Sequence, residues 1–301
     1  MLFGDTMKKI AIVTDSNSGI TAEEAERLGV HILPMPFCIN GKTFYEDTDL
    51  TQQRFFAELK PQDLISTSQP SLVSVLQLWH ALLQEYDEIV HIPMSSALSG
   101  EYSAACALAA DFSGRIFVVD NQRISATQRQ SVLDAAALAE EGRDGAWIKA
   151  FLEKHRFESS IYVMVNSLEY LKRGGRITPA AAAIGTLLRL RPVLQIQGDK
   201  LDSYACARSI RQARDIMARA ILHDCRMRFD AGEHAEKVSF AIAYSGSGEE
   251  AVRFRDFLQN LFPGHLIRTA ALTLSIACHV GPGALGLSCC KKREYLSAEG
   301  I

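Results

Sequence analysis

Continuous apolar runs alternate with helical patterns in the first half of the chain. Apolar runs at 10–13, 88–94 and 115–120 are typical of strands, and an alanine-rich segment at 101–112 predicts a helix between the last two. Strands that are buried on both faces have uninterrupted apolar sequences. A repeated strand–helix–strand order indicates a parallel sheet with helices on both faces. The first half is therefore predicted to be a three-layer α/β domain.

Two local signals refine this picture near the start of the chain. Thr21 and Glu24 have the spacing of a capping box, and Gly29 is placed to end the helix that they begin. Further on, Asn40-Gly41 lies between two strand-like segments, and this dipeptide is a strong signal for a hairpin.

The second half has a different pattern. Strands are predicted at 161–165, on both sides of a turn at 197–200, at 238–245 and at 265–272. A helix around 248–261 separates the last two. Hairpins mixed with helical crossovers indicate a mixed sheet with helices on one side.

The length fits two domains. A chain of 301 residues corresponds to about two domains at roughly 150 residues each. The change of pattern near residue 160 predicts an N-terminal α/β domain at 7–160 and a C-terminal α/β domain at 161–301.

Composition and charge narrow the classes of partner and location. The net charge is -3 and no block of Lys and Arg dominates a segment, so nucleic acid and anionic membrane are poor candidates for a main partner. Seven cysteines without paired spacing indicate reduced thiols. The first residues do not resemble a secretory signal, so a cytoplasmic protein is expected.

One long uncharged segment, 270–290, has the length of a membrane span. It contains Gly281-Pro282-Gly283, which would break a helix, so we expect a buried strand, a loop and a second short element and no membrane insertion. The tail at 288–301, with Cys289 and Cys290, is expected to be a disordered end or a thiol-bearing surface segment.

Hydroxyl groups gather where the predicted strands end. Such clusters lie at 14–18, 66–71 and 95–96, and ligands of open parallel sheets bind beyond the carboxyl ends of the strands. Hydroxyls and backbone amides at helix starts bind anions. Each cluster could also be an ordinary N-cap. A serine nucleophile is disfavoured, because no base stands nearby and the G-x-S-x-G motif is absent.

Two further groups are candidates for binding. His279 precedes Gly-Pro-Gly, so the sequence is expected to present one imidazole on a turn. Arg173 and Arg176 flank two glycines after an amphipathic turn. These cations either complete a helix C-terminus or contact phosphate or an acidic partner.

The motifs together resemble the DegV family, the fatty-acid-binding proteins of bacterial fatty acid kinase. From Lys8 to Leu287 they follow in order: TDSNSG, INGKTFYED, TSQPS, IPMSSALSGEYSAA, SLEYLKRGGRI, LLRLRPVL and HVGPGALGL. The sequence departs from the family pattern at Glu101, where a threonine is common, and at 121–127, a turn that here lacks glycine.

The resemblance implies a carrier and not a catalyst. It implies two α/β domains with a long-chain fatty acid between them, a separate fatty acid kinase as partner, and neither a metal nor a cofactor besides the bound lipid. The residues that match the carboxylate site of the family are Thr67, Ser68, Ser95, Ser96 and His279. Arg173 and Arg176 match its kinase or phosphate side.

An enzyme is the alternative interpretation. In this reading a hydrolase or kinase-like domain would act on a small metabolite and use Asp15 or a loop serine. The missing base near Ser95 and Ser96 and the missing nucleotide loop favour the carrier.

Overall fold

The computed structural model describes residues 8–46, 48–60, 63–183, 190–198 and 200–301. Residue 7, where the first predicted domain begins, and residue 199, within the predicted turn at 197–200, lie outside these ranges, as do Asp47 and 187–189 of two family motifs. In this part of the chain, no helix combines the length and the apolar character needed to span a bilayer.

The N-terminal layers are built on a four-stranded parallel sheet. Its order is β2 (Val30–Leu33), β1 (Ile10–Asp15), β6 (Glu88–Ile92) and β7 (Ile116–Val118). The helices are α1 (Ala22–Leu28), α3 (Leu72–Leu82), α4 (Glu101–Ala109), α5 (Ala126–Glu140) and α6 (Gly145–Lys154). The predicted capping box of α1 is present, and Gly29 ends the helix in the left-handed conformation.

Alternate residues of these strands pack into two different cores. Ile12 and Val90 lie with α5 and α6 on one face. Val13 and Ile89 lie with α3 and α4 on the other. The period of two places successive side chains on opposite faces of the sheet, so uninterrupted apolar runs give the predicted three layers.

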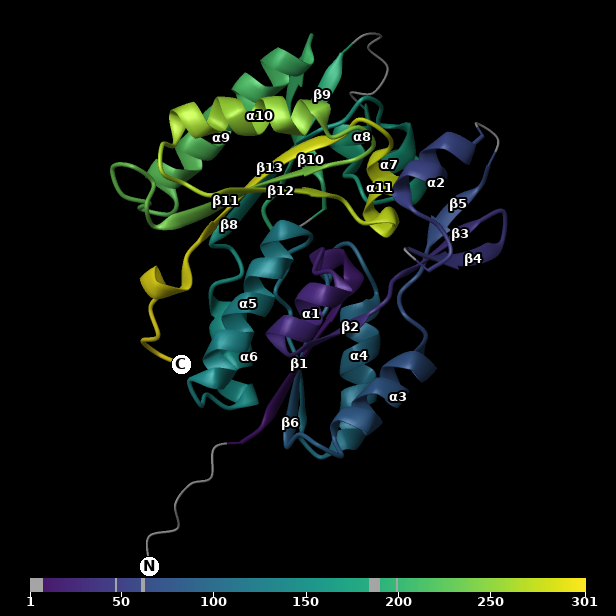
Figure 1. Cartoon of the computed structure of the whole chain (residues 1–301), viewed down its shortest axis with the longest axis vertical. Helices are drawn as coiled ribbons and strands as arrows, with labels where there is room; N and C mark the ends of the chain where they lie inside the picture. Colours follow the sequence, from purple (N-terminus) through teal and green to yellow (C-terminus); the bar gives the residue numbers. More distant parts are fainter. Residues whose placement is uncertain (1–7, 47, 61–62, 184–189, 199) are drawn as a thin grey trace, which may run out of the picture.

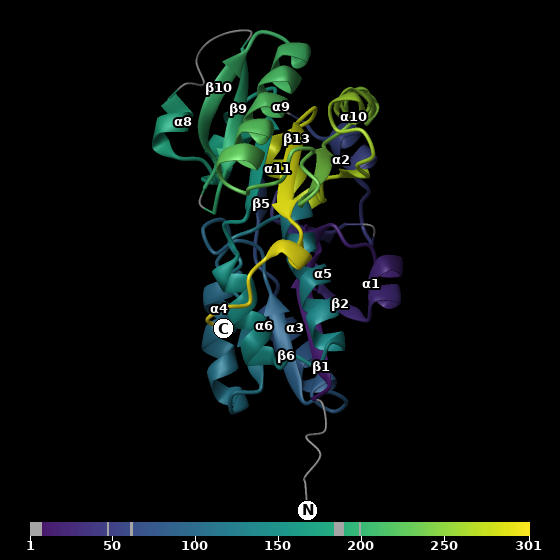
Figure 2. The same cartoon turned by 90° about the vertical axis from the view of Figure 1, so that its left-hand side faces the viewer.

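The C-terminal sheet has six strands and is mixed. Its order is β10 (Asp202–Ala207), β9 (Arg191–Ile196), β8 (Ser159–Met164), β13 (Leu285–Lys291), β11 (Val238–Tyr244) and β12 (Ile267–Ala271). Only β11 and β12 pair in parallel. α9 (Ile210–Met227) and α10 (Glu249–Leu261) cover its outer face, as Figures 1 and 2 both show.

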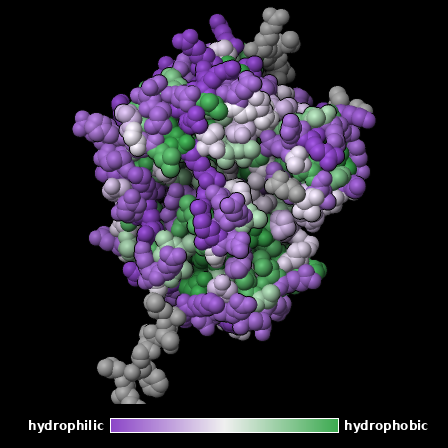
Figure 3. All heavy atoms as spheres, viewed as in Figure 1, coloured by the Kyte–Doolittle hydropathy of each residue, from purple (hydrophilic) through white to green (hydrophobic). Residues whose placement is uncertain are grey.

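The inner face of this sheet is turned toward the N-terminal layers. A shared core of apolar side chains joins Val163 and Leu194 of the sheet to Met94 and Leu98 of the N-terminal half. Shorter helices complete it: α7 (Glu169–Gly174), α8 (Pro179–Ala183) and α11 (Leu274–Val280). Hydrophilic side chains cover much of the face seen in Figure 3, with hydrophobic ones in patches between them.

The segment 270–290 differs from its predicted structure. After β12 ends at Ala271, the chain forms helix α11 and then the seven-residue strand β13, which lies between β8 and β11 within the sheet. His279 is therefore in the last turn of a helix and not on a turn. An uninterrupted apolar sequence does not distinguish a buried helix from a buried strand.

A small antiparallel sheet connects the two halves. It consists of β4 (Lys42–Tyr45), β3 (Pro36–Ile39) and β5 (Ile65–Thr67), with α2 (Gln52–Glu58) beside it. The predicted hairpin at Asn40-Gly41 is present, with both residues at positive φ. The domain ranges 7–160 and 161–301 stay predictions, since these strands from the first half pack on α11.

The tail also differs from expectation. Cys289 and Cys290 are buried in β13 and are not on the surface. Beyond them, the main-chain oxygen of Ser297 lies 2.9 Å from Nε2 of His155, the C-cap of α6, and Leu296 packs against the N-terminal core. The tail is therefore held against α6 (Figure 1).

Candidate functional site

An apolar cavity lies between the N-terminal layers and the inner face of the C-terminal sheet. Its space, including the part that opens to solvent, is about 1010 Å³. Most of the lining is aliphatic and comes from Met35, Met94, Leu98, Ile124, Ala126, Ile161, Val163, Leu171, Ile196, Leu201, Ala243, Leu272, Ile276, Val280 and Leu287. A cavity of this kind suits a ligand that is largely hydrocarbon.

Thr67 and His279 meet at this cavity. A hydrogen bond of 2.7 Å joins Thr67 Oγ1, at the end of β5, to His279 Nε2, in the last turn of α11. The other ring nitrogen lies against Gly174, where an added Cβ would come within 2.2 Å of Nδ1. Both residues line the cavity, so the two halves of the chain form this polar end together.

Burial keeps the imidazole neutral. It lowers the pKa of His279 to about 4, and the positive charge of Arg176 adds to this effect. Near neutral pH the ring can therefore donate one hydrogen bond and accept another.

The two arginines have different positions. Arg176 lines the cavity, and its Nε donates to the main-chain oxygen of Leu98 at 3.3 Å. Arg173 lies on α7, is exposed and does not line the cavity. The predicted basic pair is thus split between the cavity wall and the surface.

The three predicted serines also differ in whether they line the cavity. Ser68 lines the cavity, whereas Ser95 and Ser96 do not. Ser95 is fully buried, and its Oγ accepts a hydrogen bond from the backbone N–H of Ala97 at 3.3 Å. Ser95 Oγ thus closes a local turn and does not cap a helix, since the N-cap of α4 is Gly100. Ser99 of the same motif lies on the cavity wall.

Six polar lining residues were not among the predicted site residues, although Asn17 and Gln69 lie within the predicted clusters at 14–18 and 66–71. They are Asn17, Gln69, Ser99, Ser125, Ser275 and Ser288. Asn17 belongs to the hydroxyl-rich segment after β1, which was a usable signal. Ser275 and Ser288 stand inside the long uncharged segment, where nothing in the local pattern indicates a polar lining.

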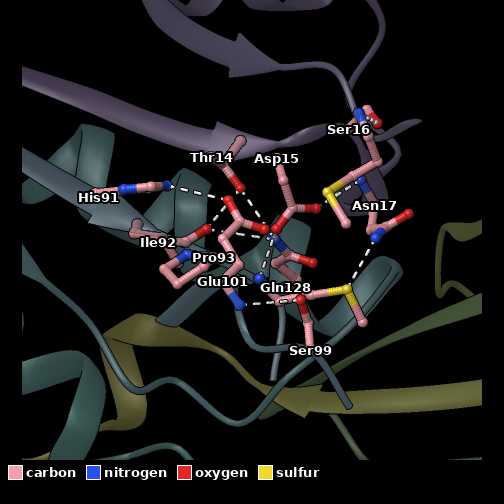
Figure 4. A network of polar contacts seen from close by, with 12 residues as sticks. Thr14, Asp15, Ser16, Asn17, His91, Ile92, Pro93, Ser99, Glu101 and Gln128 are labelled. Atoms are coloured by element: carbon pink, nitrogen blue, oxygen red, sulfur yellow. Dashed lines mark hydrogen bonds and ion pairs between the residues drawn. The ribbon is translucent and has the colours of Figure 1, made fainter. Parts of the chain in front are cut away.

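A network of polar groups extends from Asn17 and Ser99 of the cavity wall to buried side chains (Figure 4). The carboxylate of Asp15 accepts hydrogen bonds from the backbone N–H groups of Met94 at 2.6 Å and Asn17 at 2.8 Å. The side chain of Gln128 donates to it at 3.1 Å. Asp15 is fully buried and is not part of the cavity lining, so it is not placed to attack a ligand there.

Glu101 and His91 belong to the same network. Glu101 Oε1 lies 3.4 Å from His91 Nε2, and both side chains are buried. Burial raises the pKa of Glu101 to about 8 and lowers that of His91 to about 4. Burial, followed by the nearby charge of Glu101, also raises the pKa of Asp15. Near neutral pH the contact between Glu101 and His91 is therefore one between neutral groups and not an ion pair.

The sequence model of the family described as "Uncharacterised protein, DegV family" matches residues 9–292. The chain belongs to the DegV family. Among the described residues, no three His, Cys, Asp or Glu side chains are placed to hold a metal ion.

Solved DegV structures have the same fold. A DegV family protein of Thermus thermophilus, described as fatty acid binding, is 30% identical with a TM-score of 0.85, over 94% of this chain and 99% of that one. DegV of Bacillus subtilis, described as a fatty acid binding protein, is 28% identical with a TM-score of 0.82, over 95% and 100%. A DegV domain-containing protein of Deinococcus radiodurans is 29% identical over 93% and 97%.

Proposed function

We propose that the protein binds one long-chain fatty acid in the cavity between its two sheets and presents the carboxylate to a separate fatty acid kinase, which forms the acyl phosphate. The observation that carries this proposal is an aliphatic cavity in which Thr67 and His279 form a polar end. Relatives described as fatty acid binding, at 28% and 30% identity over nearly the whole chain, support it.

The hydrocarbon would supply the affinity. A sixteen-carbon chain has about 14 methylenes, and burial at about 0.8 kcal/mol each gives roughly 11 kcal/mol before entropy is subtracted. The polar end then has to orient the carboxylate more than to hold it.

Thr67, Ser68 and His279 are the proposed carboxylate donors. A hydroxyl and a neutral imidazole donate hydrogen bonds without the strong ion pair that an arginine would form. Arg176 shares the cavity, and its guanidinium faces a backbone carbonyl. Exposed Arg173, three residues away, is then the proposed contact for the kinase or its phosphate groups.

The carrier interpretation is favoured over an enzyme. His279 is the one histidine among the described residues that line the cavity, and its pKa of about 4 makes it a weak base. Asp15, the candidate nucleophile of the alternative, is buried behind the wall.

Extraction of the purified protein with organic solvent, followed by mass spectrometry, tests the proposal. We expect a fatty acid at about one molecule per chain, either co-purified or after incubation with palmitate. A Val163→Asp variant, with a charge in the cavity wall, should lose the lipid. Absence of lipid from the wild type after incubation would contradict the proposal.

A further inference from the structure

The helix that carries His279 does not cap its own N-terminus. Thr273 has the extended backbone of an N-cap, but its side chain makes no capping hydrogen bond to α11. Thr273 Oγ1 donates instead to Asn17 Oδ1 at 2.8 Å, and Ser275 Oγ donates to the same oxygen. Because Asn17 follows β1, the start of α11 is bound to the N-terminal layers.

The capping acceptor comes from elsewhere in the chain. Glu46 Oε2 accepts a hydrogen bond from the backbone N–H of Leu274, the first residue of α11, at 2.7 Å. An N-terminal N–H group of a helix has no partner within the helix, and Leu274 is fully buried. Glu46 therefore satisfies a group that water cannot reach.

The two faces of α11 have different neighbours. Leu274 and Cys278 pack with Phe37 and Phe55 of the small sheet and α2. Ser275, Ile276, His279 and Val280 line the cavity. Any shift or rotation of α11 would therefore move the imidazole relative to Thr67, whose β5 belongs to the same small sheet.

The C-terminal end of α11 is closely packed against Gly174. The ring of His279 lies so close to Gly174 that even a methyl group there would collide with it. Close contact at one end and hydrogen bonds from Asn17 and Glu46 at the other define one position for the helix.

We propose that Glu46 and Asn17 are positioning residues, which act through α11 to hold the imidazole of His279 against Thr67 and thereby orient the bound carboxylate. The inference rests on the proposed function. It assigns the orientation of the head group to two residues, one of which does not line the cavity, while the affinity for the acyl chain resides in the aliphatic wall.

Glu46→Ala, Glu46→Gln and Glu58→Ala form the matched set of variants. The amide oxygen of Gln can still accept from the N–H of Leu274, so this variant should behave like the wild type. Glu58 is an exposed acid on nearby α2 that pairs with Arg54, and its removal should change nothing. Each variant is loaded with palmitic acid labelled with ¹³C at the carboxyl carbon, and its lipid content is measured by mass spectrometry.

We expect Glu46→Ala to retain about one lipid per chain while the carboxyl resonance of the lipid shifts toward that of the unbound acid. The lipid should exchange about tenfold faster, the effect of leaving the N–H of Leu274 without its acceptor. An unchanged resonance would overturn the proposal. So would loss of the lipid together with a drop in melting temperature, because Glu46 would then support the cavity as a whole.

A second measurement needs no lipid. In delipidated protein, the pH titration of the His279 Cε1–H resonance reports the burial of the ring. Glu46→Ala should raise the pKa of the imidazole by about one unit toward its ordinary value, because the ring becomes more hydrated, and Glu46→Gln should not. An unchanged titration would overturn this proposal, whether or not the wild type binds a fatty acid. Failure of the wild type to bind a fatty acid would contradict the proposed function and not this measurement.

Discussion

The protonation states of several buried side chains in this protein depend more on burial than on neighbouring charges. Glu101 is almost completely buried next to Asp15 and His91. Two carboxyl groups and an imidazole share this place, and burial disfavours a charge on each of them. Near neutral pH a protonated Glu101, and not an ion pair with His91, is therefore expected here.

The proton on the carboxyl group of Glu101 should make the stability of the protein depend on pH. Glu101 has a pKa of about 8 in the folded state against an ordinary value of 4.5. The contribution of Glu101 to the free energy of unfolding is fully present below pH 4.5. It is lost as the pH rises to about 8, by about 1.4 kcal/mol per pH unit. His91 changes in the opposite direction only between about pH 4 and 6.5, so wild-type stability should fall between about pH 6.5 and 8.

Glu101→Gln should remove most of that fall. We expect the variant to match the wild type near pH 4.5 and to exceed it by on the order of 2 kcal/mol or more near pH 8. Urea unfolding at several pH values measures the difference, with exposed Glu140→Gln as the control. Parallel stability curves for Glu101→Gln and the wild type would show that Glu101 is ionised in the folded protein.

For single site residues, the sequence alone does not distinguish a structural role from a binding role. A serine after a strand is equally suited to cap a turn and to bind an anion, and only the three-dimensional path of the chain decides. Ser95 and Ser99 each accept a hydrogen bond from the backbone N–H two residues further on, but of the two Ser99 alone lines the cavity. Thr67 and His279 were identified through the family motifs, since they are far apart in sequence and meet only where β5 contacts α11.

At the scale of elements, Glu24 joins three segments from the two halves of the chain. On α1, it accepts hydrogen bonds from Arg129 of α5 and Arg268 of β12. Burial alone would raise the pKa of Glu24, but the hydrogen bonds from Arg268, from the backbone of Thr21 and from Arg129 lower it to about 2. One carboxylate thus connects the N-terminal helices to the edge of the C-terminal sheet.

Glu24→Gln should therefore destabilise the protein near neutral pH. A group with a lowered pKa stabilises the fold above its ordinary pKa of 4.5, and this contribution is lost as pH falls toward 2. We expect a loss of about 1 to 2 kcal/mol at pH 7, since partial exposure screens the charges, and a smaller loss in high salt. Chemical unfolding at low and high ionic strength measures it, and an equal loss at both would exclude an electrostatic origin.

The elements that could be predicted from the sequence have a clear local pattern, and those that could not lack one. β1 and β6 were predicted because short apolar runs ended by polar residues suit strands that are buried on both faces. α11 and β13 were not, because the apolar segment around them offers neither a period of two nor a helical stripe. The tail was misjudged because its partner, α6, is distant in sequence.

At the scale of the whole molecule, the cavity wall is shared between the halves. Leu98 and Ile124 come from the first half, and Val163 and Leu287 from the second. A ligand that fills this space contacts both sheets at once. It should stabilise the whole fold and not one part of it.

Fatty acid should accordingly raise the melting temperature of the delipidated protein. At a concentration 100-fold above Kd, binding adds about 2.7 kcal/mol to the free energy of unfolding. Calorimetry with and without palmitate measures the shift, with decane as a control that lacks the carboxylate and should stabilise less. An identical shift with decane would mean that the polar end contributes no affinity.

The place of β13 in the C-terminal sheet also bears on how the chain folds as it is made. β13 follows every other described strand in the sequence, yet it alone pairs both with β8 and with β11. Until β13 emerges during synthesis, β8–β10 and β11–β12 form two separate groups with unpaired edges. Until β13 has been synthesised, newly made chains therefore expose the unpaired edges of β8 and β11, which favour aggregation.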